Sequence, residues 1–98
     1  MKTEVRVAPQ VHEFVRSRAP EPRQALRKAL KGLAGEQGDT KALEGKLAGW
    51  NRLRVSSYRV LYKETAQSGV RIINCVYANH RSVVNELFQQ LLADELAS

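Results

Sequence analysis

Four arginines in the second half of the sequence lie on, or directly after, stretches in which polar and apolar residues alternate. Arg52 and Arg54 flank Leu53, so in an extended strand their side chains point to the same face. Arg59 lies on the next alternating stretch, and Arg81 follows a third. Guanidinium groups hold phosphate oxygens through paired hydrogen bonds. The four residues therefore predict an RNA-binding or phosphoryl-transfer site, the alternative being a solvated sheet face that only keeps the protein soluble.

Three further residues are candidates for the same chemistry. His80 directly precedes Arg81, and an imidazole can serve as a general acid or base near neutral pH. Trp50 falls on the arginine side of its stretch, where it would stack a base or else fill the core. Lys46, in a segment rich in glycine and lysine, is a second candidate base and an RNA contact.

The hydrophobic periodicity indicates the elements that must position these residues. Apolar residues alternate in the strands and recur at helical spacing in the helices. We expect the order β-α-α-β-β-β-α, with a polar loop over residues 38–49 and a tight turn at Ser56 and Ser57. The expected strands are 3–7, 51–55, 58–63 and 70–78, and the expected helices are 9–18, 21–34 and 83–96. This pattern predicts an α+β fold: a small antiparallel sheet of about four strands, with the helices packed on one face.

Composition narrows the class of protein further. The 98 residues suit a single domain, 1–98, and carry a net charge of +6. Residues 82–98 carry three negative charges and no Lys or Arg, so the basic body favours a polyanionic or acidic partner. No apolar run is long enough to span a membrane, and no signal peptide is recognisable, which predicts a cytoplasmic protein. The lone Cys75 excludes an internal disulfide, and His12 has no partner at metal-ligand spacing, so we expect no metal and no cofactor.

Three motifs resemble the RelE/ParE toxin superfamily. They are Leu-Glu-Gly at 43–45, Arg-Leu-Arg-Val-Ser-Ser-Tyr-Arg-Val-Leu-Tyr at 52–62, and His-Arg at 80–81. The hairpin string is the most specific of the three, and the element order matches along nearly the whole chain. The resemblance implies the toxin half of a bacterial type II toxin–antitoxin pair.

The RelE branch of this family implies a metal-independent endoribonuclease. Its members cleave messenger RNA, usually on the ribosome, and thereby inhibit translation. By resemblance, Arg59 and Arg81, with His80, are catalytic, and Arg52 and Arg54 bind RNA. The sequence departs from many RelE-like nucleases because residues 82–88 contain no tyrosine.

Two alternatives share the fold. A ParE-like protein would inhibit DNA gyrase without cutting RNA, and a decayed relative would only bind an antitoxin. All three readings predict a hetero-oligomer with an antitoxin. We expect the antitoxin to dock on the apolar stripe of the last helix and on the basic face of the second helix. The residues predicted for this contact are Leu87, Phe88, Leu91, Arg23 and Arg27.

Overall fold

The computed structural model describes the backbone of residues 2–97 and the side chains of residues 2–90. A five-stranded mixed sheet has the order β1-β5-β4-β3-β2, where β1 pairs parallel with β5 and the other neighbours are antiparallel. Its strands are β1 Lys2–Val7, β2 Asp39–Ala42, β3 Asn51–Val55, β4 Tyr58–Gln67 and β5 Val70–His80. The helices are α1 Pro9–Arg16, α2 Pro20–Gly32 and α3 Arg81–Ala97, with short 3-10 turns η1 Leu33–Gly35 and η2 Gly45–Leu47. The α+β class is confirmed and the element order roughly matches, but the sheet has five strands, not about four, because β2 is added, and it is mixed, not antiparallel, because β1 pairs parallel with β5.

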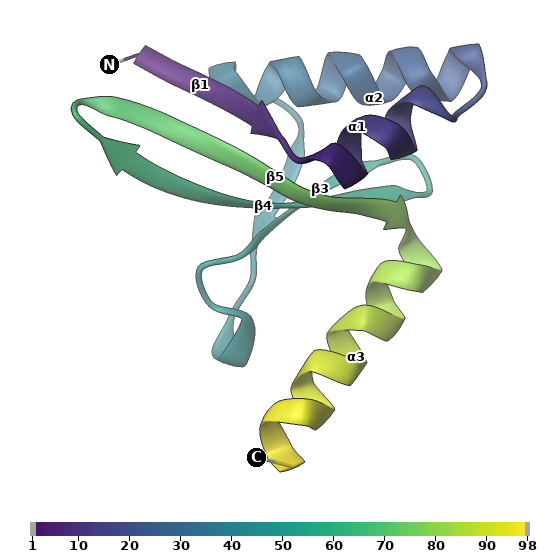
Figure 1. Ribbon diagram of the computed structural model, residues 1–98, viewed down its shortest axis with the longest axis vertical. Helices are drawn as coiled ribbons and strands as arrows, with labels where there is room; N and C mark the ends of the chain where they lie inside the picture. The colour runs from purple at the N-terminus through teal and green to yellow at the C-terminus, as the bar shows by residue number, and fades with distance from the viewer. Residues whose placement is uncertain (1, 98) are drawn as a thin grey trace.

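The two N-terminal helices form a hairpin over one face of the sheet (Figure 1). Pro9 and Pro20 each open a helix, where the missing N–H costs nothing. Val11, Leu26 and Leu30 are buried against Leu53 and Val60 of the sheet. This layer is the core, and the opposite sheet face carries arginines beside the buried Leu61.

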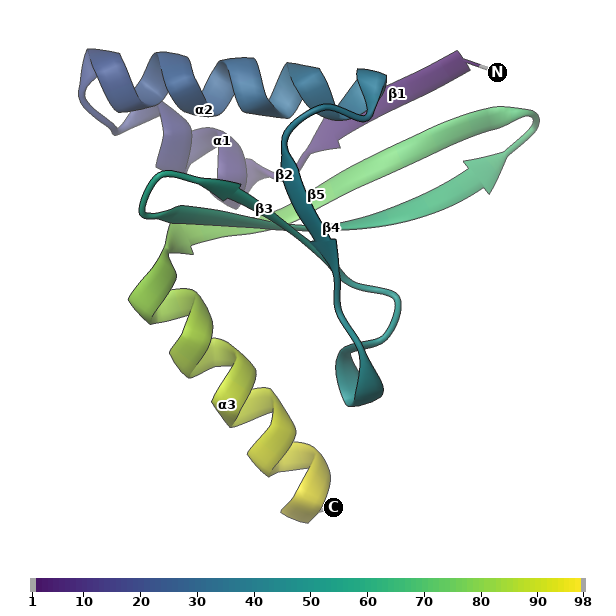
Figure 2. The ribbon, with the colours of Figure 1, turned by 180° about the vertical axis from the view of Figure 1, so that it is seen from behind.

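The last helix departs from the expectation that all helices share one face. Figures 1 and 2 show α3 leaving the end of β5 and projecting away on the side opposite to α1 and α2. Val84 in its first turn is buried, whereas Leu87 and Phe88 are half-buried. Within the described residues, no helix is long and apolar enough to cross a membrane.

Two strand segments differ from the sequence-based expectation. Residues 39–42 form β2 instead of a loop, and β4 runs on to Gln67. All four β2 residues and the segment 63–67 are exposed, so neither carries the apolar alternation that marks a strand. The β4–β5 turn is built on positive φ at Ser68 and Gly69, which suits a two-residue hairpin.

Candidate functional site

The sheet register places three of the predicted arginines on one face. Arg54 lies opposite Arg59, and Arg52 lies opposite Leu61, across β3 and β4. These side chains point away from the core, because their neighbours Leu53 and Val60 point into it. Arg81 opens α3, and its backbone N–H donates to the Ser57 carbonyl at 2.8 Å, which fixes it beside the β3–β4 turn. We call this surface, with Arg52, Arg54, Arg59 and Arg81, the arginine face.

Arg52, Arg54 and Arg81 lie close enough to Arg59 to affect its ionisation. The pKa of Arg59 is lowered first by burial and then by the positive charges of Arg52, Arg54 and Arg81. Arg59 is held by its own turn: Nη1 donates to the carbonyls of Ser56 and Tyr58, both at 2.9 Å. A guanidinium has five N–H donors, so Arg59 keeps donors for an incoming phosphate. The structure therefore brings Arg52, Arg54 and Arg59 to one sheet face, with Arg81 nearby at the start of α3.

One carboxylate lies among these cations. Asp39 of β2 is opposite Arg54 in the register, and its Oδ2 lies 2.6 Å from Arg54 Nε. Its Oδ1 lies 3.8 Å from an Arg52 terminal nitrogen. Neither Arg59 nor Arg81 forms an ion pair with a carboxylate among the described side chains. The arginine face therefore keeps a positive excess.

Arg52 presents a donor that the described residues leave unsatisfied. Its Nε is buried and donates to no acceptor in the described part of the chain. A buried, unsatisfied donor of a charged group costs free energy, and an anion on the arginine face is the partner that would relieve it.

The structure does not bring His80 to the arginine face. His80 is opposite Tyr58 in the register, so it lies on the α1 side of the sheet. Its ring meets Tyr58 edge-on at 6.3 Å between centroids, and Tyr58 in turn meets Phe14 of α1 at 5.6 Å. His80 Nδ1 accepts from the Ser82 backbone N–H at 3.3 Å, so the His80 side chain caps the N-terminus of α3.

Trp50 and Lys46 lie away from the turn where the arginines gather. Lys63 Nζ sits 4.2 Å from the Trp50 ring centroid, a cation–π contact. Trp50, Leu61, Leu87 and Phe88 help to line an apolar cavity of about 270 Å³ between the sheet and α3. Lys46 is exposed in η2, on the segment that precedes β3, whereas Arg54, Arg59 and Arg81 surround the β3–β4 turn at the other end of that strand.

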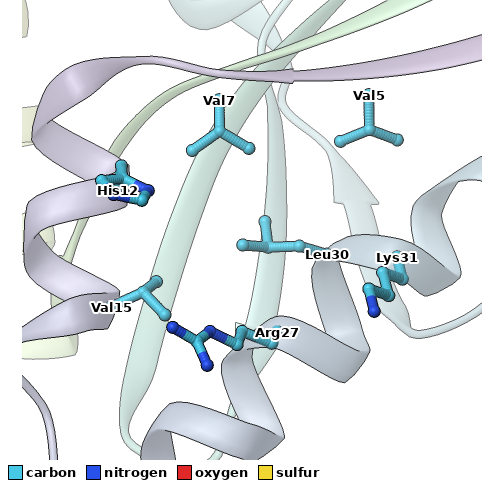
Figure 3. Close-up of a pocket in the computed structure, with 7 residues that line it drawn as sticks. All are labelled: Val5, Val7, His12, Val15, Arg27, Leu30 and Lys31. Carbon is cyan, nitrogen blue, oxygen red and sulfur yellow. The ribbon is translucent and has the colours of Figure 1, made fainter.

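The predicted antitoxin contacts fall into two separate regions. Leu87 and Phe88 line the cavity beside α3, and Leu91 lies outside the described side chains. Arg27 borders a second cavity of about 500 Å³ between β1, α1 and α2, together with His12 and Lys31 (Figure 3). Its apolar wall is formed by Val5, Val7, Val15 and Leu30. Arg23 is half-buried in the first turn of α2 and does not line this cavity.

Sequence reasoning missed two members of the arginine face. Asp39 was placed in a loop, and Asn79, which is opposite Arg59 on β5, was not singled out. Asn79 donates to the Tyr77 hydroxyl at 3.0 Å and accepts from the His80 N–H at 2.8 Å. No local pattern marks either residue, because both owe their place to pairing between strands. No three His, Cys, Asp or Glu side chains in the described residues are grouped to hold a metal ion.

Solved structures provide the link to known proteins. No protein-family model and no curated protein matches the sequence. A chain of the RelBE2 toxin–antitoxin complex from Mycobacterium tuberculosis is similar, with a TM-score of 0.64 and 24% identity, over 83% of this chain and 100% of that chain. A YoeB/ParE toxin from Agrobacterium tumefaciens also gives a TM-score of 0.64, at 14% identity over 82% and 98% of the two chains.

An archaeal structure shows the same likeness. A chain of the RelE–RelB complex from Pyrococcus horikoshii OT3 has a TM-score of 0.61 and 24% identity, over 83% of this chain and 97% of that chain. The chain therefore has a RelE/ParE-type toxin fold, as the three sequence motifs indicated.

Proposed function

We propose that this protein is the toxin of a toxin–antitoxin pair and that it cleaves messenger RNA without a metal ion. The observation that carries the proposal is the gathering of Arg52, Arg54, Arg59 and Arg81 on one sheet face, where the last three surround the β3–β4 turn. Such a cluster binds a phosphodiester and stabilises the extra negative charge of its transition state. Its site of action is the ribosome in the cytoplasm, where cleavage stops translation.

Each arginine has a distinct part in this proposal. Arg52 and Arg54 bind the RNA backbone, and the unsatisfied Nε–H of Arg52 donates to a phosphate oxygen. Arg59, fixed by two carbonyl bonds, stabilises the phosphorane. Arg81, at the start of α3, adds its charge to the positive end of the helix dipole.

Expression in growing bacteria tests the proposal. We expect the unmodified chain to arrest growth and to generate new transcript ends, with plasmid supercoiling unchanged. Arg59→Ala should lower cleavage by on the order of 10²–10³. Arg16→Ala is the matched control, because Arg16 is exposed on α1 and, among the described side chains, pairs with Glu13 alone. Intact transcripts with altered supercoiling would point to gyrase instead, and harmless expression would indicate an inactive relative; either result overturns the proposal.

The proposed partner is an antitoxin. The M. tuberculosis and P. horikoshii structures to which the chain is similar are complexes of this kind. The proposed docking surfaces are the cavity lined by Leu87 and Phe88 and the α2 surface that carries Arg23 and Arg27. If an acidic partner pairs with Arg27, association should slow as salt rises. Association rates that do not change with salt would contradict the role of Arg27.

A further inference from the structure

A row of four polar side chains crosses the arginine face. The register aligns Asp39 of β2, Arg54 of β3, Arg59 of β4 and Asn79 of β5. Neighbouring strands lie about 4.8 Å apart, so the Asp39 carboxylate is roughly two strand spacings from Arg59. A nucleotide whose phosphate engages Arg54 and Arg59 therefore brings its ribose within reach of Asp39.

Cleavage of RNA without a metal ion needs a group that accepts the 2′-hydroxyl proton. An arginine cannot accept it, because it stays protonated in proteins. His80 lies on the other side of the sheet, against Tyr58. Asp39 is on the correct face, is about half exposed, and sits 2.6 Å from Arg54 Nε.

We propose that Asp39 is the general base of this protein, a catalytic residue that takes the 2′-hydroxyl proton of the bound nucleotide. This inference rests on the proposed nuclease function. A carboxylate has about four lone-pair positions, so Asp39 can keep its bond to Arg54 and still accept from the substrate hydroxyl. The single side chain of Arg54 thereby holds both the base and the phosphate in position.

The step balances as an in-line transesterification. The 2′-O–H bond breaks, its proton passes to the Asp39 carboxylate, and the 2′-oxygen forms a bond to phosphorus. The bond from phosphorus to the 5′-oxygen breaks, and that oxygen takes a proton from water. The products are a 2′,3′-cyclic phosphate and a 5′-hydroxyl, and Asp39 returns its proton to solvent.

A purely structural role for Asp39 makes a different prediction. If its carboxylate only offsets repulsion among the arginines, its removal lowers stability and strengthens RNA binding, while cleavage continues. If Asp39 is the general base, removal of its carboxylate abolishes cleavage while RNA binding is retained or becomes tighter. Binding and single-turnover cleavage therefore have to be measured on the same variants.

The test uses Asp39→Asn, Asp39→Glu and, as a control with the same charge change, Glu13→Gln on α1. Binding is measured on a short RNA whose 2′-hydroxyls are replaced by hydrogen, which cannot react. Cleavage is measured on the matching ordinary RNA, free and on programmed ribosomes. We expect Asp39→Asn to lose on the order of 10²–10⁴ in cleavage rate. It should bind the unreactive RNA more tightly than the unmodified protein, and Asp39→Glu should regain part of the rate.

The outcomes separate this inference from the function on which it rests. If the unmodified protein cleaves and Asp39→Asn cleaves equally well, Asp39 is not the base, although the nuclease function stands. The same holds if Asp39→Glu is as inactive as Asp39→Asn while both remain folded by circular dichroism. If the unmodified protein cleaves neither free nor ribosome-bound RNA, both the function and the inference are overturned.

Discussion

Arg54 and Arg59 lie directly opposite each other on β3 and β4. Like charges in this arrangement destabilise a sheet, and here they contribute to the lowered pKa of Arg59. Asp39 offsets part of the repulsion through its contact with Arg54. The remaining repulsion between Arg54 and Arg59 persists in the folded protein, and an anion bound between the two side chains would relieve it.

RNA binding should depend steeply on salt. If three or four phosphates are neutralised, log K against log salt should fall with a slope of about −2 to −3, since single strands give about −0.7 for each phosphate. Arg54→Ala should make the slope shallower by about 0.7. Fluorescence anisotropy with the unreactive RNA measures both, and Arg16→Ala should leave the slope unchanged. A flat salt dependence would mean that phosphates do not bind to this face.

Cys75 makes the stability depend on pH in the alkaline range. Its thiol is only 1% exposed, and burial raises its pKa to about 11. An unfolded thiol ionises near pH 8.5, so between there and pH 11 the unfolded state loses a proton that the folded state keeps. Stability is therefore full below about pH 8.5 and falls above it, by roughly 1.4 kcal/mol per pH unit from this group.

Urea unfolding of the unmodified protein and of Cys75→Ala, at pH 8 and pH 10, measures the contribution of the thiol. Cys75→Ala should reduce the free energy of unfolding at both pH values. It should also make the decrease in that free energy from pH 8 to pH 10 smaller than in the unmodified protein. An identical pH dependence in the two proteins would show that Cys75 does not titrate as described.

Gly38 is required immediately before Asp39. Its φ is +105°, and a Cβ there would lie 3.1 Å from Leu53 Cδ1. Gly69 has φ +78° but open space around it, so Gly69→Ala meets backbone strain alone. We expect Gly38→Ala to cost more than Gly69→Ala, by on the order of 1 kcal/mol, because a packed core side chain must also shift. Equal losses in urea unfolding would contradict this account of the entry to β2.

Arg71 ties the exposed end of the β4–β5 hairpin to the body. It pairs with Glu64 on β4 and, at 3.3 Å, with Glu36 after η1. The bond to Glu64 is the main cause of the raised Arg71 pKa. Because both carboxylates are substantially exposed, Glu64→Gln should cost at most about 1 kcal/mol. Hydrogen exchange over 64–73 should accelerate, and 0.5 M salt should reduce the difference; no change in exchange would show that the pair does not restrain the hairpin.

The sequence predicted the elements that carry an apolar pattern. Leu53 and Val60 alternate with arginines, so β3, β4 and their shared face could be placed before the structure was known. β2 could not be predicted, because Asp39–Ala42 is exposed at every position and is held only by pairing with β3. The position of His80 depends on the register of β5, which a bulge shifts near Tyr62. The direction of α3 depends on how the chain leaves β5, which no local pattern specifies.

The pairing of β1 with β5 joins the first strand made to the last. On a ribosome, β1 remains without its neighbour until β5 has been synthesised. A product interrupted by a premature stop before residue 70 has no strand to bridge β1 and β4, so its sheet stays divided. A messenger RNA cut before the codons of β5 therefore yields a chain that cannot complete this sheet.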